Sequence, residues 1–373
     1  LMGLLGPRVS NLRFMVDLKR SAGSYVYSAT HGTHLLDMFG NISSLPLGYN
    51  HPRLLKAIER NGHLIAQRQA NGMFPSVDHK DVMSKTLMRI LPKGYTPETT
   101  FVHTDQCGTM AVENLVKCLY ARVLREKLPS GCPIISFQGG FHGRTLGALS
   151  LTHSNPLHKQ GFPSVDTLVA PLPLHDRDLK SCMFHVEQLL EGPVAGVIVE
   201  PVQGEGGDRH PSPLFLQGVQ SLCREKKVPF IVDEVQTGLY ATGKMWAHEH
   251  HSLLHPPDAV VFSKRTMISG FLAQPWLVPD FDYQCFNTWM GDTIYGVLLE
   301  AVLDEIEESN LLATMEECAE TLRDGLQHER IRNIRGFSTF MAFDVDERDD
   351  LVSKLEDLQV VVGSCGESSI RLR

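Results

Sequence analysis

Lys264 and Asp233 are the residues best suited to do chemistry, because each lies at the end of a short apolar segment. Asp233 directly follows Val228–Val232, and Lys264 follows Ala259–Phe262 after one serine. A lysine desolvated at such a position has a lowered pKa, so its neutral amine can form a Schiff base. A buried carboxylate needs a cation or a strong donor beside it. Taken singly, Asp233 also fits a helix cap or a surface ion pair, and Lys264 also fits a solvated turn.

Two glycine-containing segments precede this pair in the chain. Cys107-Gly108-Thr109 stands before a predicted helix at Ala111–Leu124, where N–H groups, a hydroxyl and the helix dipole would bind an anion. The segment Gly139–Thr145 contributes the flat ring of Phe141 and the carboxylate-binding guanidinium of Arg144. The ordinary alternatives are a plain helix N-cap for the first segment and core packing for the aromatic ring of the second.

Together, these four features fit one ligand, a phosphorylated pyridine aldehyde bound as an imine. The acid would meet a protonated pyridine nitrogen, the lysine the aldehyde, and the first glycine turn the phosphate. No metal or nicotinamide interpretation uses all four, and a G-x-G-x-x-G fingerprint after the first strand is absent. The eight cysteines form no C-x-x-C pair, so we expect no metal site and interpret them as buried free thiols.

The elements that position these residues resemble those of an open α/β sheet. The apolar segments that end in glycine, acid or lysine are Pro133–Phe137, Val194–Val199, Val228–Val232 and Ala259–Phe262. Short apolar segments without alternation are typical of parallel strands buried on both faces. Ligands bind beyond the carboxyl ends of such strands, so we expect the polar residues there to meet.

The flanking sequence predicts a second, smaller α+β unit. Gly23–Leu36 fits a hairpin, and short strands are expected near Thr339–Phe343 and Gln359–Val362. The expected helices are Arg53–Asn61, Asp81–Leu91, Pro213–Lys227, Val297–Glu308 and Leu311–Gln327.

Composition excludes several classes of protein. The chain has 373 residues, is 42% hydrophobic and carries a net charge of −8 without a basic block, which argues against nucleic acid as a partner. No apolar stretch approaches the roughly 18 residues that cross a bilayer, so no membrane partner is expected.

In sequence, the chain resembles the class III (ω-) aminotransferases among the fold-type I pyridoxal-phosphate enzymes, and most closely the eukaryotic branch that acts on 4-aminobutyrate. The motifs that carry the resemblance are Ile42–Pro52 (ISSLPLGYNHP), Gly140–Thr145 (GFHGRT), Ile198–Asp208 (IVEPVQGEGGD), Asp233–Gly238 (DEVQTG), Gly243–His250 (GKMWAHEH), Phe262–Lys264 (FSK), Phe286–Trp289 (FNTW) and Ser369–Arg371 (SIR). They run in order from about Gly23 to the last residue.

The resemblance implies a role for each cofactor-binding position. Lys264 would form the Schiff base with pyridoxal 5′-phosphate and later move the proton, while Asp233 would pair with the pyridine nitrogen. The remaining cofactor contacts would come from Gly108 and Thr109 at the phosphate, Phe141 and Val235 on the two ring faces, Gln236 at the phenolic oxygen, and Thr288 from a partner subunit.

The resemblance also implies how substrates are bound. Arg144 would bind the carboxylate of the ω-amino acid, and Ile42 would line the pocket. Glu200 and Arg371 would form a switch: paired for the ω-amino acid, and unpaired so that Arg371 receives the α-carboxylate of glutamate. Glu205 lies near them in the same motif. The implied reaction moves the terminal amino group of 4-aminobutyrate, or a similar ω-amino acid, to 2-oxoglutarate.

The family further implies a large cofactor-binding domain at 51–292 and a small domain built from 1–50 and 293–373, the latter truncated at its end. It implies a homodimer with shared active sites in the mitochondrial matrix, with the cytoplasm as the alternative. The first twenty residues are rich in Arg and Lys, which fits either a transit peptide or a truncated mature chain; the absence of a starting Met favours truncation.

Several positions depart from the family pattern. Met110 replaces the second cysteine that holds an iron–sulfur cluster in the animal branch, so no cluster is expected. Thr109 replaces a serine, Arg265 a lysine, and Ser269 a glycine in what we predict to be a turn. Two alternatives therefore stay open: a transaminase for β-alanine, lysine or ornithine, and a non-catalytic relative.

Overall fold

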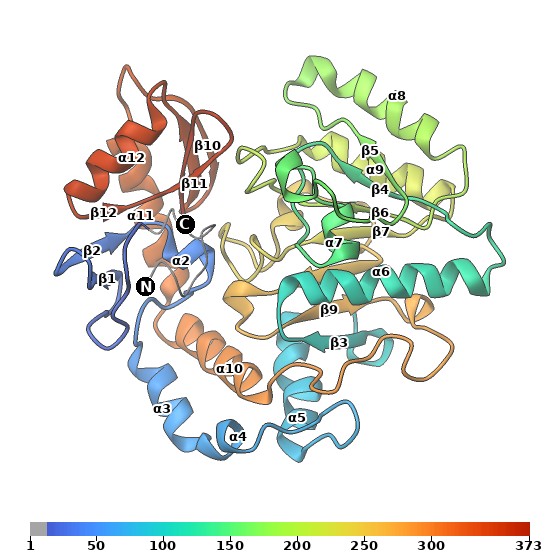
Figure 1. Cartoon of the computed structure of the whole chain (residues 1–373), viewed down its shortest axis with the longest axis horizontal. Helices are drawn as coiled ribbons and strands as arrows, with labels where there is room; N and C mark the ends of the chain where they lie inside the picture. Colours follow the sequence, from blue (N-terminus) through green and yellow to red (C-terminus); the bar gives the residue numbers. More distant parts are fainter. Residues whose placement is uncertain (1–12) are drawn as a thin grey trace.

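A seven-stranded sheet lies at the centre of residues 13–373, the part of the chain that the computed structural model describes (Figure 1). The strands are β3 (Phe101–Asp105), β4 (Ile134–Phe137), β5 (Thr167–Ala170), β6 (Gly196–Val199), β7 (Phe230–Asp233), β8 (Ala259–Phe262) and β9 (Ser269–Ala273). Their spatial order is β3-β9-β8-β7-β6-β4-β5, and the five strands from β8 to β5 are mutually parallel. The predicted α/β class with a mostly parallel sheet is confirmed.

Helices cover both faces of this sheet, which explains why its five parallel strands are mostly apolar. One apolar cluster forms between the sheet and α6 (Gly108–Arg125), and a second between the sheet and α8 (Leu179–Leu189) with α9 (Pro213–Glu225). The strand β7 begins at Phe230 rather than Val228, because Pro229 has no N–H to donate to a neighbouring strand.

The strand β9 contradicts the prediction of a turn at Ser269. Ser269 is its first residue, all five residues of the strand are buried, and the strand runs antiparallel to both β3 and β8. Ser269 also contacts Ser263 through their hydroxyls at 2.7 Å, so the replacement is accommodated by a hydrogen bond.

Further helical segments lie before the sheet, after it and, for α7, between the strands β4 and β5. They are α3 (Pro52–Arg60), α4 (Gly62–Ala66), α5 (Val77–Asp81), a π-helical turn at Val82–Thr86, a 3₁₀ turn at Leu87–Ile90, α7 (Leu146–Ser150), α10 (Thr293–Glu308), α11 (Leu311–Gly325) and α12 (Arg348–Asp357). The predicted helix at Asp81–Leu91 is therefore divided among three short helical segments. Helix α10 packs against α3, and both border an apolar cluster around Trp246.

Strands from the two ends of the chain lie together away from the central sheet (Figure 1). The hairpin of β1 (Tyr25–Ser28) and β2 (Thr33–Asp37) is extended by β12 (Val360–Val361), which is parallel to β2. A second sheet has the order β10-β11-β14-β13, from Arg332–Phe337, Phe340–Asp344, Ser369–Leu372 and Gly363–Cys365. The predicted hairpin and late strands are present, whereas the boundaries at 51 and 293 stay a prediction.

A left-handed turn follows the hairpin. The residues of α2 (Gly40–Ser43) all have positive φ, between 48° and 62°. Such values are strained for a β-branched residue such as Ile42 and cluster at functional sites. The turn therefore marks its surroundings as a place where function constrains the backbone.

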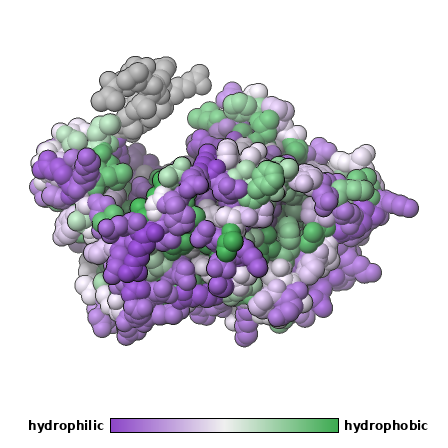
Figure 2. All heavy atoms as spheres, turned by 90° about the horizontal axis from the view of Figure 1, so that it is seen from below, coloured by the Kyte–Doolittle hydropathy of each residue, from purple (hydrophilic) through white to green (hydrophobic). Residues whose placement is uncertain are grey.

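The described surface is mostly polar on one face (Figure 2). Hydrophilic residues predominate on the face in Figure 2, and the hydrophobic ones form separate groups. Among residues 13–373, no helix is both long and apolar enough to span a bilayer, and no three His, Cys, Asp or Glu side chains are grouped to bind a metal ion. The first twelve residues, which belong to the segment that fits either a transit peptide or a truncated mature chain, lie outside the described part.

Candidate active site

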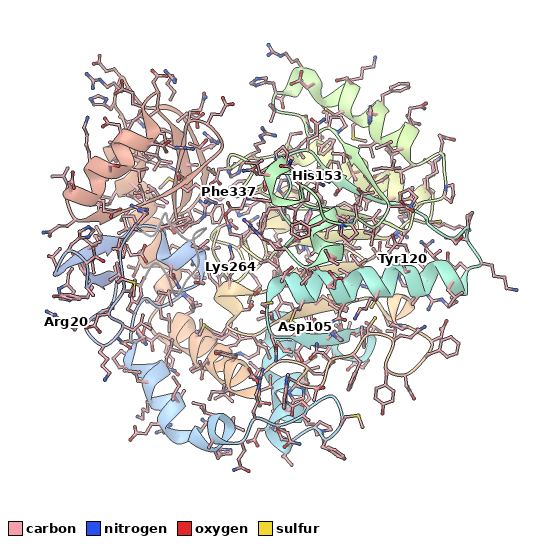
Figure 3. All side chains as sticks on the ribbon, viewed as in Figure 1. Arg20, Asp105, Tyr120, His153, Lys264 and Phe337 are labelled. Carbon is pink, nitrogen blue, oxygen red and sulfur yellow. The ribbon has the colours of Figure 1, made fainter. Side chains whose placement is uncertain are left out.

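The structure brings Lys264 and Asp233 together, as the sequence predicts. They follow adjacent parallel strands, β8 and β7, whose carboxyl ends share one edge of the sheet. Lys264 opens a 3₁₀ turn with φ of 56°, a strained value for a lysine, and lies near the middle of the molecule (Figure 3). Charged groups from the middle of the chain (Glu205, Asp233) and from its C-terminal segment (Arg371, Arg373) act on its amine.

Burial and surrounding charges set the protonation of Lys264. Burial lowers its pKa to about 8; Glu205 and Asp233 oppose this, whereas the nearby guanidinium groups of Arg373 and Arg371 contribute to it. A substantial fraction of the amine is therefore neutral at mildly alkaline pH. Neutral amine is the form that attacks an aldehyde.

The carboxylate of Asp233 is fixed by two partners. One oxygen lies 2.7 Å from Nδ1 of His142, and the other accepts the backbone N–H of Val235 at 3.0 Å. Both His142 and Asp233 are buried. His142 thus orients Asp233, a role that the sequence alone does not reveal because a histidine at that place also fits ordinary core packing.

The two glycine turns meet around Thr109. A Cβ added to Gly108 would lie 2.9 Å from the side chain of Val235, so only glycine fits at this start of α6. The Thr109 hydroxyl accepts the backbone N–H groups of Arg144 and Thr145 at 2.9 and 3.1 Å. The predicted phosphate turn is therefore tied to the segment that carries the aromatic ring and the substrate arginine.

Gln236 is positioned by residues that sequence reasoning missed. Its Oε1 accepts a hydrogen bond from Arg373 at 3.1 Å, and Arg373 forms a fully buried ion pair with Asp208 at 2.6 Å. The backbone carbonyl of Gln236 accepts from Ser43 at 3.3 Å, which brings the left-handed turn to the same place. Ile42 in that turn is 48% exposed, so its side chain remains available for contact.

Of the two states predicted for Glu200 and Arg371, this structure has the unpaired one, and the switch itself stays a prediction. Arg371 pairs with Glu205 instead, at 2.8 Å. The guanidinium carbon of Arg371 also lies 4.9 Å from the centre of the Phe39 ring. Glu200, at the end of β6, accepts the backbone N–H of Phe141 at 2.8 Å. Burial, followed by repulsion from Asp233, raises the pKa of Glu200 well above its usual value. Glu200 follows β6 directly and faces the loop of Phe141. Glu205 lies five residues farther along the chain, where Arg371 of β14 contacts it.

Arg144 is exposed and contacts His158. Its Nη2 lies 3.1 Å from Nε2 of His158, and its guanidinium carbon lies 5.9 Å from the centre of the Phe141 ring. Burial and the charge of Arg144 lower the pKa of His158, which favours the neutral ring that accepts this hydrogen bond. Arg144 therefore keeps donors free for a carboxylate beside the aromatic face.

A cavity of about 1290 Å³ lies beside Glu205 and His158, the partners of Arg371 and Arg144. Its walls come from the loops after β4 and β6 and from the C-terminal strands, and they include His158, Glu205, Arg209, Arg335 and Ser369. The lining carries both signs of charge, with Arg209, Arg335 and Arg348 facing Glu205, Asp344 and Glu367. Thr288 lies elsewhere, on the exposed loop before α10, where its carbonyl accepts the N–H of Gly72 at 3.2 Å.

Comparison with known proteins decides the family. The sequence pattern of "Aminotransferase class-III" matches residues 7–373. The chain belongs to the class III aminotransferases. This aminotransferase is 39% identical to 4-aminobutyrate aminotransferase from Dictyostelium discoideum, over 99% of this chain and 82% of that protein. It is 35% identical to mitochondrial 4-aminobutyrate aminotransferase from Mus musculus, over 97% and 81%.

Solved structures agree with this assignment. Lysine aminotransferase from M. tuberculosis in the internal aldimine form has a TM-score of 0.87 and 28% identity, and the alignment covers 100% of this chain and 93% of that one. Ornithine aminotransferase from Toxoplasma gondii has a TM-score of 0.80 at 22% identity, which shows the shared fold. Class III aminotransferases depend on pyridoxal 5′-phosphate, so the predicted cofactor and reaction type are confirmed.

The residues present in this aminotransferase fit the cofactor. An aldehyde requires a partly neutral amine, which Lys264 offers. A pyridine nitrogen requires a fixed carboxylate, which Asp233 offers. A phosphate requires close approach to the backbone, which Gly108 allows beside Val235. Gly108 opens an 18-residue helix, whose N-terminus favours an anion.

The pKa of Lys264 predicts how cofactor uptake depends on pH. In cofactor-free protein, the rate at which added pyridoxal phosphate becomes fixed to Lys264 by borohydride should rise about tenfold per pH unit below 8, because only neutral amine reacts, and should level off above pH 8. Quantitative mass spectrometry of the labelled peptide measures this rate. A rate that keeps rising to about pH 10.4, as for an ordinary lysine, would contradict the lowered pKa.

Proposed function

We propose that this aminotransferase moves the terminal amino group of 4-aminobutyrate to 2-oxoglutarate, giving succinate semialdehyde and glutamate. The observation that carries the proposal is the 2.8 Å ion pair between Arg371 and Glu205, together with an exposed Arg144 that has no carboxylate partner among residues 13–373. An ω-amino acid has one carboxylate and needs one free arginine, whereas glutamate has two and needs both. One site can serve both half-reactions if the Arg371 pair opens.

The contacts of Asp233 and the pKa of Lys264 support a separate role for each residue in the reaction. Bound pyridoxal phosphate supplies an electron sink for the carbon that loses a proton. Asp233, held by His142 and Val235, keeps the pyridine nitrogen protonated. Lys264 moves the proton, since a pKa of about 8 lets it act as both acid and base near neutral pH.

The other proposed contacts complete the site. Phe141 and Val235 enclose the ring, Gly108 and Thr109 hold the phosphate, and Gln236 approaches the phenolic oxygen. Arg144 orients the donor carboxylate, and Ile42 lines its path. Support comes from the contacts that already join these segments, Thr109 to Arg144 and Gln236 to Ser43.

Glu205→Gln is expected to change the balance between the two half-reactions. Loss of the charge leaves Arg371 unneutralised beside the donor, so KM for the ω-amino acid should rise by roughly tenfold, as for the loss of one charge-assisted contact. KM for 2-oxoglutarate should fall or stay constant. Separate half-reaction kinetics measure both values.

Glu200→Gln is the matched control for this change. Its amide oxygen can still accept the N–H of Phe141, so the ratio of the two KM values should stay near that of the unmodified protein. If Glu200→Gln shifts the ratio and Glu205→Gln does not, Arg371 is regulated by Glu200 and the pairing proposed for the donor complex is wrong.

An amino-donor panel tests the substrate. Protein saturated with pyridoxal phosphate is assayed with 4-aminobutyrate, β-alanine, ornithine and lysine against 2-oxoglutarate. The highest kcat/KM is expected for 4-aminobutyrate, in line with the names of the relatives at 34–39% identity. A higher value for lysine or ornithine would assign a different donor, and no transfer from any donor would favour a non-catalytic relative.

We further propose a homodimer in which Thr288 reaches the phosphate of the partner's site, with a large domain at 51–292 and a small domain from the flanking segments. The exposure of Thr288 supports this, because an exposed loop can contact a second chain. The mitochondrial matrix is the proposed location, by analogy with the mammalian relatives named mitochondrial, and the cytoplasm is the alternative. Light scattering that gives the mass of one chain would contradict the dimer.

A further inference from the structure

Two cysteines far apart in the sequence have side chains in contact. The sulfurs of Cys118 and Cys285 lie 3.3 Å apart, although the residues are separated by 167 positions. Cys118 lies inside α6 and is fully buried, and Cys285 lies on the loop between β9 and α10 and is partly exposed. All eight cysteines fall within the described residues, and this pair has its sulfurs in contact.

The surroundings give the two thiols different roles. The hydrogen bond between the two sulfurs, aided by the positive charge of Lys117, lowers the pKa of Cys285 against the opposing effect of burial. The same hydrogen bond, together with burial, raises the pKa of Cys118. A thiol with a lowered pKa and partial exposure is the one that attacks, whereas its buried neighbour resolves the product.

The pair is held in place by contacts that do not involve sulfur. The same oxygen of Asp105, at the end of β3, accepts hydrogen bonds from Asn114 of α6 at 2.9 Å and from Asn287 of the loop at 2.7 Å. Figure 3 shows Asp105 below α6, at this junction. The helix and the loop are thus fixed to one carboxylate. This contact keeps the two cysteines adjacent both as free thiols and as a disulfide.

We propose that Cys118 and Cys285 form a dithiol–disulfide couple that reacts with low-molecular-weight disulfides of the glutathione type. The Cys285 thiolate attacks one sulfur of the small disulfide, whose S–S bond breaks and releases one thiolate. Cys118 then loses its proton and attacks the sulfur of Cys285, which releases the second thiolate. In balance, two protein thiols and one small disulfide give one protein disulfide and two small thiols.

The disulfide would join α6 to the loop before α10. Helix α6 begins at Gly108 and Thr109, which are proposed to hold the phosphate of this chain's site, and the loop carries Thr288, which is proposed to reach the phosphate of the partner's site. Oxidation would therefore fix the position of one phosphate-binding segment relative to the other. The linkage itself does not depend on the proposed function; its effect on the cofactor does. Because the bond closes a long loop of chain, it should raise Tm by on the order of 5 °C.

The experiment uses the full chain loaded with cofactor and oxidised glutathione as the probe. After incubation, free thiols are blocked under denaturing conditions, and the protein is digested with trypsin and chymotrypsin without reduction. Mass spectrometry should find a peptide that links Cys118 to Cys285, and Tm should rise by the stated amount and return after reduction. The exposed Cys318 provides the control, since Cys318→Ser should retain the linked peptide.

Two variants keep the proposal falsifiable. Cys285→Ser, at the partly exposed position, should fold normally, lose the linked peptide and lose the rise in Tm. Cys118→Ser should leave glutathione attached to Cys285. The proposal is overturned if glutathione remains on Cys285 of the unmodified protein without a link to Cys118, or if neither residue reacts. Changed activity without the linked peptide would also count against it, whereas the linked peptide in protein that fails every transamination assay would overturn only the proposed function.

Discussion

Replacement of Lys264 by alanine is expected to abolish amino transfer and to lower kcat by on the order of 10⁵-fold, the scale seen when a covalent catalyst is removed. The amine that holds the cofactor and moves the proton is lost, and no neighbour supplies another. Arg265 lies next to it and is half-buried, but a guanidinium does not lose its proton in proteins. Steady-state transamination with the preferred donor measures the effect.

Lys264→Arg is the matched control for the loss of the amine. It keeps a positive charge near Glu205 and Asp233 but offers no neutral amine, so it should be as inactive as the alanine variant. Thermal unfolding should show that both variants fold. Full activity of either variant would exclude Lys264 as the residue that carries the cofactor.

Asp233→Asn should lower kcat by about 10³-fold, a loss comparable to removal of one electrostatic group that acts on developing charge. The amide has nearly the shape of the carboxylate but cannot keep the pyridine nitrogen protonated. Measurement of kcat together with bound cofactor separates this effect from simple loss of binding. Retention of kcat within about tenfold would show that the ring nitrogen needs no carboxylate here.

His142→Gln provides the comparison for this result. The glutamine amide can still donate to Asp233, so the loss in kcat should be much smaller than that of Asp233→Asn. An equal loss would mean that His142 does more than orient the carboxylate.

The sequence allows the parallel core to be predicted because burial on both faces leaves continuous apolar segments, such as Ala259–Phe262, that end in polar residues. The direction of a strand leaves no such mark. The segment Ser269–Ala273 is equally apolar yet runs antiparallel, and it was expected to begin with a turn. The left-handed turn at Gly40–Ser43 is hidden for a different reason, since Ile42 is a residue that disfavours positive φ.

In the candidate site, too, some contacts can be predicted from the sequence and others cannot. Lys264 and Asp233 could be paired in advance because adjacent parallel strands end at one edge of the sheet. The choice between Glu200 and Glu205 as partner of Arg371 could not, because both lie in one motif and the outcome depends on where β14 crosses it. The contacts of Arg373 with Gln236 and of Cys118 with Cys285 join segments more than a hundred positions apart, and no local pattern encodes them.

The most direct test of the account is to find where pyridoxal phosphate becomes attached. Protein saturated with the cofactor is treated with borohydride, digested, and mapped by mass spectrometry. The account predicts one phosphopyridoxyl group per chain, on Lys264, and its disappearance when 4-aminobutyrate converts the cofactor to its amine form before reduction. Attachment to another lysine, or active protein in which Lys264 stays unmodified, would contradict it.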